Sequence, residues 1–228
     1  MRRLAGALDA RTLIVAGLAV AFVAAYWAAV SLSEDYYVVE SPPGSVFNAD
    51  AAGLQVLYRY LDGLGVEVET LQQFEELPAS GTIVVAAPAP FAKAPTAPEA
   101  RRLAEWVEGG GRLVLAGAFA RDVIRGYTPG AGFGVATESS MPLQLPSRYA
   151  IDVAEVKVGP ERLLADDAGW ATHMKDISGQ VLVSRAIGAG EVVWLAGTFP
   201  LTNAGIGEAD NARFATLLAA GPGPVYFD

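Results

Sequence analysis

The segments TIVVAAP at Thr82–Pro88 and RLVLAG at Arg112–Gly117 determine the fold class that we predict. Each is a short, continuous apolar run, a pattern typical of parallel strands that are buried on both faces. Between them, Thr96 and Glu99 have the spacing of a capping box, in which each side chain bonds the other residue's backbone N–H at the start of a helix. A strand, a helix and a strand in this order predict one unit of a parallel α/β sheet.

The glycine run Gly109–Gly111 follows the predicted helix. A phosphate-binding loop is one interpretation, because such loops are rich in glycine. Phosphate loops, however, lie between a strand and the following helix, whose N-terminal N–H groups hold the anion. Gly109–Gly111 lies between a helix and the following strand, so we interpret it as a helix stop.

Similar patterns continue on both sides of this unit. Apolar spacing and turn residues predict a helix from Leu54 to Leu64, a strand at Val66–Leu71, a hairpin at Val181–Gly197, a helix at Asp210–Leu218 and a last strand at Pro224–Phe227. Residues 127–180 have weak periodicity, and we interpret them as an irregular insertion or an antiparallel edge. The pattern predicts an α/β fold with an open, mostly parallel sheet and helices on both faces.

Thr12–Leu32 is an uncharged run that we interpret as a transmembrane helix ahead of this fold. As a helix it spans about 31 Å, close to the roughly 30 Å hydrocarbon thickness of a bilayer. A cleaved signal peptide is the alternative, but its apolar region is usually about 7–15 residues long and ends at small residues. Tyr26 and Trp27 occupy the expected cleavage region, so we favour an uncleaved anchor in the lipid bilayer.

Basic residues gather on one side of this run. Arg2, Arg3 and Arg11 precede it, and the next basic residue is Arg59. Because basic residues stay on the cytoplasmic side, we predict a single-pass protein of the cell membrane with its N-terminus in the cytoplasm. The predicted order is a cytoplasmic segment at 1–11, the helix at 12–32, a linker at 33–45 and an extracytoplasmic α/β domain at 46–228.

Composition argues against several classes of function. The formal net charge of −9 repels phosphate backbones, so we expect no nucleic acid partner. The chain has no cysteine and one histidine, so thiol nucleophiles, disulfides and zinc centres are not expected. His173 lies in no strained nucleophile turn, and we interpret it as a surface residue of a loop. We predict no catalytic residue, metal or cofactor.

Polar residues cluster in two segments next to predicted strands and helices. SVFNADAAG precedes the first helix of the domain, and TFPLTNAGIGEADNARF follows the strand at Val192–Gly197. Ligands of open α/β sheets bind between the loops at the carboxyl ends of strands. We therefore predict a rim for a ligand or partner made of Asn48, Asp50, Thr198, Asn203, Asp210 and Asn211. The alternative is that Asp50, Asn203 and Asp210 only cap helices and turns.

Four segments resemble a bacterial family: FNADAAGLQVLYRYLDGLGVEVE, AEWVEGGGRLVLAG, GAGEVVWLAG and LTNAGIGEADNARF…GPVYFD. In this order they cover most of residues 45–228 and resemble domain of unknown function 4350. The resemblance implies a flavodoxin-like fold of the class I glutamine-amidotransferase type, tethered to the membrane. It also implies membrane-protein partners and a MoxR-type ATPase, whose genes tend to lie beside those of the family.

The sequence departs from the amidotransferase pattern. Those enzymes need a cysteine nucleophile on a strand-to-helix turn, where this chain has Ala118, Phe119 and Ala120. Relatives continue beyond the segment Tyr226–Asp228, so we expect a fragment or a shorter member of the family. These features favour a membrane-anchored, non-catalytic binding or scaffolding domain in a membrane-associated assembly. The alternative is a hydrolase outside the membrane that uses carboxylates such as Asp50 and Asp210, since paired acids can do acid–base chemistry alone.

Overall fold

The computed structural model describes residues 41–71, 74, 76–86, 95–118, 120, 123, 132–164, 169–221 and 223–228. The helices in these ranges are α2 (Gln55–Gly63), α3 (Ala97–Glu108) and α4 (Asn211–Ala219), with the 3-10 helices η2 (Arg148–Ala150) and η3 (Phe199–Leu201). The strands are β1 (Val68–Thr70), β2 (Thr82–Ala86), β3 (Arg112–Ala116), β4 (Gly132–Val135), β5 (Ser139–Met141), β6 (Val156–Val158), β7 (Glu161–Leu164), β8 (Ala171–Asp176), β9 (Gly179–Ile187), β10 (Gly190–Leu195) and β11 (Val225–Phe227).

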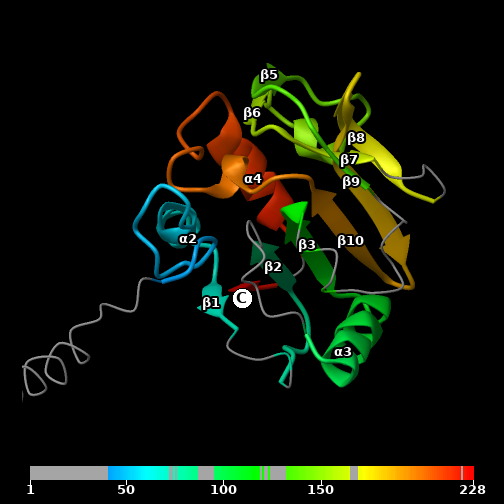
Figure 1. Cartoon of the computed structure of the whole chain (residues 1–228). Coiled ribbons are helices and arrows are strands. Elements are labelled where there is room, and N and C mark those ends of the chain that lie inside the picture. Colours follow the sequence, from blue (N-terminus) through cyan, green and yellow to red (C-terminus); the bar gives the residue numbers. More distant parts are fainter. Residues whose placement is uncertain are drawn as a thin grey trace, which may run out of the picture. The chain divides into compact units, whose positions relative to one another are not determined.

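Parallel strands form one half of the main sheet, which has nine strands within the described residues. β1, β11, β2, β3 and β10 lie side by side in this order (Figure 1). The pairing of β2 with β3 confirms the strands predicted from their apolar runs. β9 pairs antiparallel with β10, as predicted for the hairpin at 181–197. The last strand of the chain, β11, lies between β1 and β2, an insertion that no local pattern indicated.

The other half of the sheet is antiparallel, and the predicted fold class is wrong. β9, β7, β4 and β8 are joined by antiparallel pairs, so the sheet is mixed rather than mostly parallel. β4, β7 and β8 come from the segment 127–180, whose weak periodicity hid them. In β8, for example, Met174 is buried between partly exposed neighbours and the register shifts beside it, which breaks the alternation of a regular strand. The flavodoxin-like, amidotransferase-like architecture is not supported.

The predicted transmembrane helix falls in the N-terminal part of the chain, ahead of the described residues. Within the described ranges, no helix has the length and apolar character needed to cross a membrane. The segment Thr12–Leu32, the segment 1–11 that was predicted to be cytoplasmic and most of the predicted linker at 33–45 lie outside the described residues.

Helices pack on both faces of the parallel half. On one face, α2 and α4 contribute Leu57, Leu61 and Phe214 to a core that also contains Val84 of β2 and Val114 of β3. On the other face, α3 packs Leu103 and Val107 against the alternate strand residues, such as Ile83, Leu113 and Trp194. Successive residues of β2 and β3 therefore enter opposite cores, which explains why both strands are apolar after their first residues, Thr82 and Arg112.

A buried arginine ties the antiparallel half together. Arg162 of β7 has no exposed surface, and its Nε lies 2.8 Å from Oδ2 of Asp176 at the end of β8. Its Nη1 donates to the backbone oxygens of Gly159 and Glu161, at 2.8 and 2.9 Å. Burial acts to raise the pKa of Asp176, but hydrogen bonds from Arg162 and from two backbone N–H groups outweigh it and hold that pKa below its ordinary value. The guanidinium thus links β7, β8 and the turn before β7.

Candidate functional site

The structure brings part of the predicted rim together. Nδ2 of Asn203 donates to the backbone oxygens of Asn48 and Asp50, at 2.9 and 2.7 Å. Oδ1 of Asn203 accepts from the backbone N–H of Val56 at 2.8 Å. Val56 lies in the first turn of α2, so Asn203 caps a helix that is distant in the sequence. Asp50 does not cap α2, because the N-cap is Leu54 and the helix begins at Gln55.

Asp210 and Asn211 bond to another part of the chain, the residues just before β6 and β6 itself. Oδ2 of Asp210 accepts from the backbone N–H groups of Ala154 and Glu155, at 2.7 and 3.1 Å, although Asp210 occupies the N-cap position of α4. Asn211 is fully buried and bonds both the N–H and the C=O of Lys157. Thr198 is buried at the start of η3. These contacts fasten loops, and the binding role of the six residues stays a prediction.

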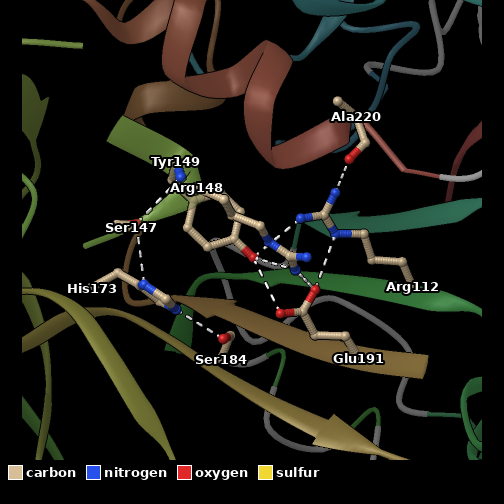
Figure 2. A network of polar contacts seen from close by, with 8 residues as sticks. All are labelled: Arg112, Ser147, Arg148, Tyr149, His173, Ser184, Glu191 and Ala220. Carbon is tan, nitrogen blue, oxygen red and sulfur yellow. Dashed lines mark hydrogen bonds and ion pairs between the residues drawn. The ribbon is translucent and has the colours of Figure 1, made fainter. Parts of the chain in front are cut away.

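A second group of polar residues lies at the amino ends of β3 and β10, and sequence reasoning missed it. Figure 2 shows this polar cluster, which consists of Arg112, Ser147, Arg148, Tyr149, His173, Ser184 and Glu191. Arg112 of β3 is paired in register with Glu191 of β10. Tyr149 and Arg148 come from η2, His173 from β8 and Ser184 from β9. The cluster therefore joins the parallel half, the antiparallel half and the segment 142–158.

Glu191 is shared by two guanidinium groups. Oε2 of Glu191 lies 3.4 Å from Nε of Arg112 and also contacts Nη2 of Arg148. The hydroxyl of the buried Tyr149 accepts from Arg112 at 3.1 Å and from Arg148 at 3.0 Å. The same hydroxyl donates to Oε1 of Glu191 at 3.4 Å. Two guanidinium charges face one carboxylate, so these four side chains carry one excess positive charge.

Arg112 also has a structural role. Its Nη1 donates to the backbone oxygen of Ala220, the C-cap residue of α4. A cation at a helix C-terminus stabilises the helix, because the last carbonyl groups carry the negative end of its dipole. Burial lowers the pKa of Arg112 from its ordinary value, yet an arginine remains charged in a protein. The buried charge is paired with Glu191, and its Nη1 and Nη2 donate to the helix end and to the Tyr149 hydroxyl.

His173 is a strand residue and is partly buried, so its interpretation as a loop residue at the surface is wrong. Its Nδ1 lies 3.2 Å from Oγ of Ser147, and its Nε2 lies 2.8 Å from Oγ of Ser184. The ring meets the ring of Tyr149 edge-on, with centroids 4.9 Å apart. Burial, followed by the charge of Arg148, lowers the pKa of His173, so the neutral imidazole is the stable form near pH 7.

This burial predicts a pH effect on stability that His173→Gln should remove. Because the pKa of folded His173 lies below its ordinary value of about 6.5, the unfolded chain binds a proton more readily. Wild-type protein should therefore lose stability as the pH falls below about 6.5. We expect the melting temperature of the variant to rise relative to wild type between pH 7 and 5.

Comparing the curves of melting temperature against pH for wild type and His173→Gln provides the control for this prediction. The pKa of Asp228 is raised to about 6, by burial and then by Glu99, so Asp228 titrates in the same range. It acts with the opposite sign, since the folded state binds that proton more tightly and gains stability as the pH falls. Subtracting the variant's curve from the wild-type curve isolates His173. Parallel curves of melting temperature against pH would show that His173 does not contribute.

The cluster lacks the arrangement of a hydrolytic triad. In a triad, one nitrogen of histidine contacts an exposed nucleophile and the other contacts a carboxylate. Here both nitrogens of His173 face serine hydroxyls, and Ser184 is buried within β9. Among the residues that the structure describes, no group of three or more His, Cys, Asp or Glu side chains could hold a metal ion. The geometry is suited to holding charge in place.

One signal in the sequence could have located the cluster. RLVLAG and EVVWLAG each place a charged residue at the start of an otherwise apolar strand, at Arg112 and Glu191. Opposite charges at matching positions of two buried strands indicate an ion pair between neighbours, because an unpaired buried charge is costly. Tyr149 and Arg148 carried no such signal, since they lie in the weakly periodic segment.

Comparison with known proteins gives a family. Residues 46–219 match the family described as Domain of unknown function (DUF4350). The chain belongs to the DUF4350 family. This result confirms the family resemblance, but it includes neither a membrane anchor nor an amidotransferase-like fold. A search of curated proteins gives no match.

Solved structures share parts of this arrangement at low sequence identity. Cytoplasmic protein STM1381 from Salmonella typhimurium LT2 has a TM-score of 0.49 and 13% identity, over 72% of this chain and 84% of that chain. Exo-beta-1,4-mannosidase Op5Man5 from Opitutaceae bacterium strain TAV5 has a TM-score of 0.45 and 15% identity, over 72% of this chain and 29% of that chain. The DUF4350 chain thus spans under a third of the mannosidase. At these scores the likeness carries no conclusion about function.

Proposed function

We propose that this DUF4350 protein is a non-catalytic binding domain. The proposal rests on one observation: the groups of the polar cluster that could transfer a proton are already engaged by other side chains of the cluster. His173 lies between two serine hydroxyls, and Glu191 lies between two guanidinium groups. A general base has to reach a proton of the substrate, and a nucleophile has to be exposed. In the cluster, both nitrogens of His173 already face hydroxyl groups and Ser184 is buried. Arg148, in contrast, presents a positive charge at the surface.

A binding role also fits the rest of the described domain. Asn203, Asp210 and Asn211 use their side chains to fasten loops, which holds the surface around them in one conformation. Rigid loops lower the entropy that is lost when a ligand or partner binds. The partners implied by the family resemblance, membrane proteins and a MoxR-type ATPase, remain predictions.

The proposal is tested by measuring turnover and binding on the same preparation of the full chain. We expect no hydrolysis of glutamine or of nitrophenyl glycosides. We also expect that at least one member of a panel of small acids, peptides and the MoxR-type ATPase raises the melting temperature, since a ligand at 100 times its Kd adds about 2.7 kcal/mol of stability. Turnover that His173→Gln or Glu191→Gln abolishes, with the melting temperature preserved, would show instead that the cluster is catalytic.

A carboxylate-dependent hydrolase is the second candidate, and Asp228 is the observation in its favour. Asp228 follows β11 at the carboxyl ends of the parallel strands, where α/β sheets bind ligands, and its N–H donates to the backbone oxygen of Val84 at 3.2 Å. Desolvation and then the charge of Glu99 raise its pKa to about 6, although the residue is exposed at the surface. A raised pKa is what a general acid requires. This candidate predicts a pH–rate profile with an apparent pKa near 6, which Asp228→Asn removes. A flat profile, or unchanged activity in Asp228→Asn, excludes that role.

A further inference from the structure

Arg148 differs from the other members of the polar cluster in its exposure. Its side chain is 53% exposed, whereas Arg112 beneath it is 6% exposed and Glu191 is 20% exposed. The guanidinium carbon of Arg148 lies 5.1 Å from the centroid of the Tyr149 ring, and Nη2 bonds the Tyr149 hydroxyl at 3.0 Å. Contacts with Tyr149 and Glu191 therefore hold Arg148 in place (Figure 2), while about half of its side chain is open to solvent.

The excess positive charge of the cluster can be neutralised by a second anion. Arg112 and Arg148 carry two positive charges, and Glu191 neutralises one of them. If Arg148 turned to an external anion, Glu191 would keep its contacts with Nε of Arg112 and with the hydroxyl of Tyr149, both at 3.4 Å. No buried carboxylate would lose its last partner in this exchange, so the cost of releasing Arg148 is small.

The chemistry of the contacts favours a carboxylate as that anion. A guanidinium presents planar N–H donors that match the two oxygens of a carboxylate. The Arg148 guanidinium already contacts one carboxylate, that of Glu191. The protein as a whole carries a formal net charge of −9, so a locally positive surface selects acidic ligands against a repulsive background.

We propose that Arg148, supported by Arg112 and Tyr149, binds the carboxylate group of an acidic ligand. This inference rests on the proposed binding function and names the chemical class of its ligand. Arg148 and the buried Arg112 supply the charge, and Tyr149 fixes the orientation of the Arg148 guanidinium. Glu191 keeps Arg148 in position while no ligand is bound.

The NMR signals of His173 can report the binding of an acidic ligand to Arg148. It is the only histidine in the chain, so its ring protons give one set of imidazole signals in a proton NMR spectrum. The charge of Arg148 contributes to the lowered pKa of His173. Ser147, Ser184 and Tyr149, which contact the ring, carry no charge near neutral pH, so Arg148 is the charged group whose neutralisation the ring reports.

The experiment follows the His173 signals of the full chain while succinate is added at constant ionic strength, maintained with sodium chloride. We expect a saturable change and a rise in the pKa of His173. Arg148→Gln should raise that pKa without ligand and weaken succinate binding at least about tenfold. Arg148→Lys should keep the pKa low but also weaken binding, because an ammonium group lacks the planar pair of donors. Melting temperatures of the variants establish that they are folded.

Arg213→Gln is the matched control. The side chain of Arg213 is 49% exposed, a fraction similar to that of Arg148. Its Nη2 lies 3.4 Å from Oδ2 of Asp152, with which it forms an ion pair. It should bind succinate like wild type. A response that grows linearly with added salt, or that persists in Arg148→Gln, overturns the proposal, as does a response to inorganic phosphate but not to succinate. If another ligand binds but succinate produces no response, this inference is refuted and the proposed function is not. Turnover of glutamine or of a glycoside refutes the proposed function.

Discussion

Replacement of Arg162 by alanine is expected to lower the free energy of unfolding by about 3–5 kcal/mol, a large part of the stability of a domain. The guanidinium is fully buried and donates to Asp176 and to the backbone oxygens of Gly159 and Glu161. Its removal leaves a partly buried carboxylate and two carbonyl groups without these donors, and it opens a cavity between β7 and β8. Urea unfolding followed by circular dichroism measures the change.

Arg213→Ala is the control for this prediction. Arg213 and Asp152 form a pair at the surface, with side chains 49% and 84% exposed, and such pairs contribute about 0–1 kcal/mol. If Arg162→Ala does not fold, Arg162→Lys keeps the charge with fewer donors and should show an intermediate loss. A cost below about 1 kcal/mol for Arg162→Ala would mean that the antiparallel half does not depend on this arginine.

Asn211→Ala is expected to cost about 2–4 kcal/mol, the second largest effect. The side chain is fully buried, and its Oδ1 accepts from the N–H of Lys157 at 2.9 Å. Its Nδ2 donates to the backbone oxygens of Lys157 and Gly205, at 3.0 and 2.8 Å. Alanine removes all three bonds and leaves the backbone groups of β6 and of the turn before α4 unsatisfied. The same unfolding measurement applies.

The neighbouring Asp210 provides a comparison within the same turn. Its carboxylate bonds two backbone N–H groups but is partly exposed, so water can replace it in Asp210→Ala. We expect a cost of about 1 kcal/mol for that variant. If both variants lose the same free energy of unfolding, burial is not the reason why the hydrogen bonds of Asn211 stabilise the fold. If either residue binds a ligand, the loss of binding should exceed what its change in stability explains.

Local patterns predicted the elements whose partners are close in the sequence. Thr96 and Glu99 form the capping box of α3, with the N–H of Thr96 donating to Oε2 of Glu99 at 2.6 Å. The apolar runs at β2 and β3 are adjacent parallel strands. In each case the signal and the structure lie within one short segment, so its residues suffice to state the preference.

Partners that are distant in the sequence were not predicted in this way. Asn203 caps α2 through Val56, although residues nearer in the sequence, such as Asp50, are equally good capping types. Arg162 pairs with Asp176 inside the weakly periodic segment 127–180. Arg112 lies outside that segment and donates to Tyr149 within it. Many aspartates and asparagines can satisfy the same donor, and only the packing of the strands decides which one is near enough.

The sequence by itself determined that two apolar strands flank an amphipathic helix in residues 82–117 and that no thiol chemistry is available. The tertiary structure decided that the sheet is mixed, that β11 lies between β1 and β2, and that a polar cluster gathers around Tyr149. The physical reason is that propensity, periodicity and capping act within a few residues of the chain. Strand order and buried polar contacts are instead set by the common burial of segments that the sequence holds far apart.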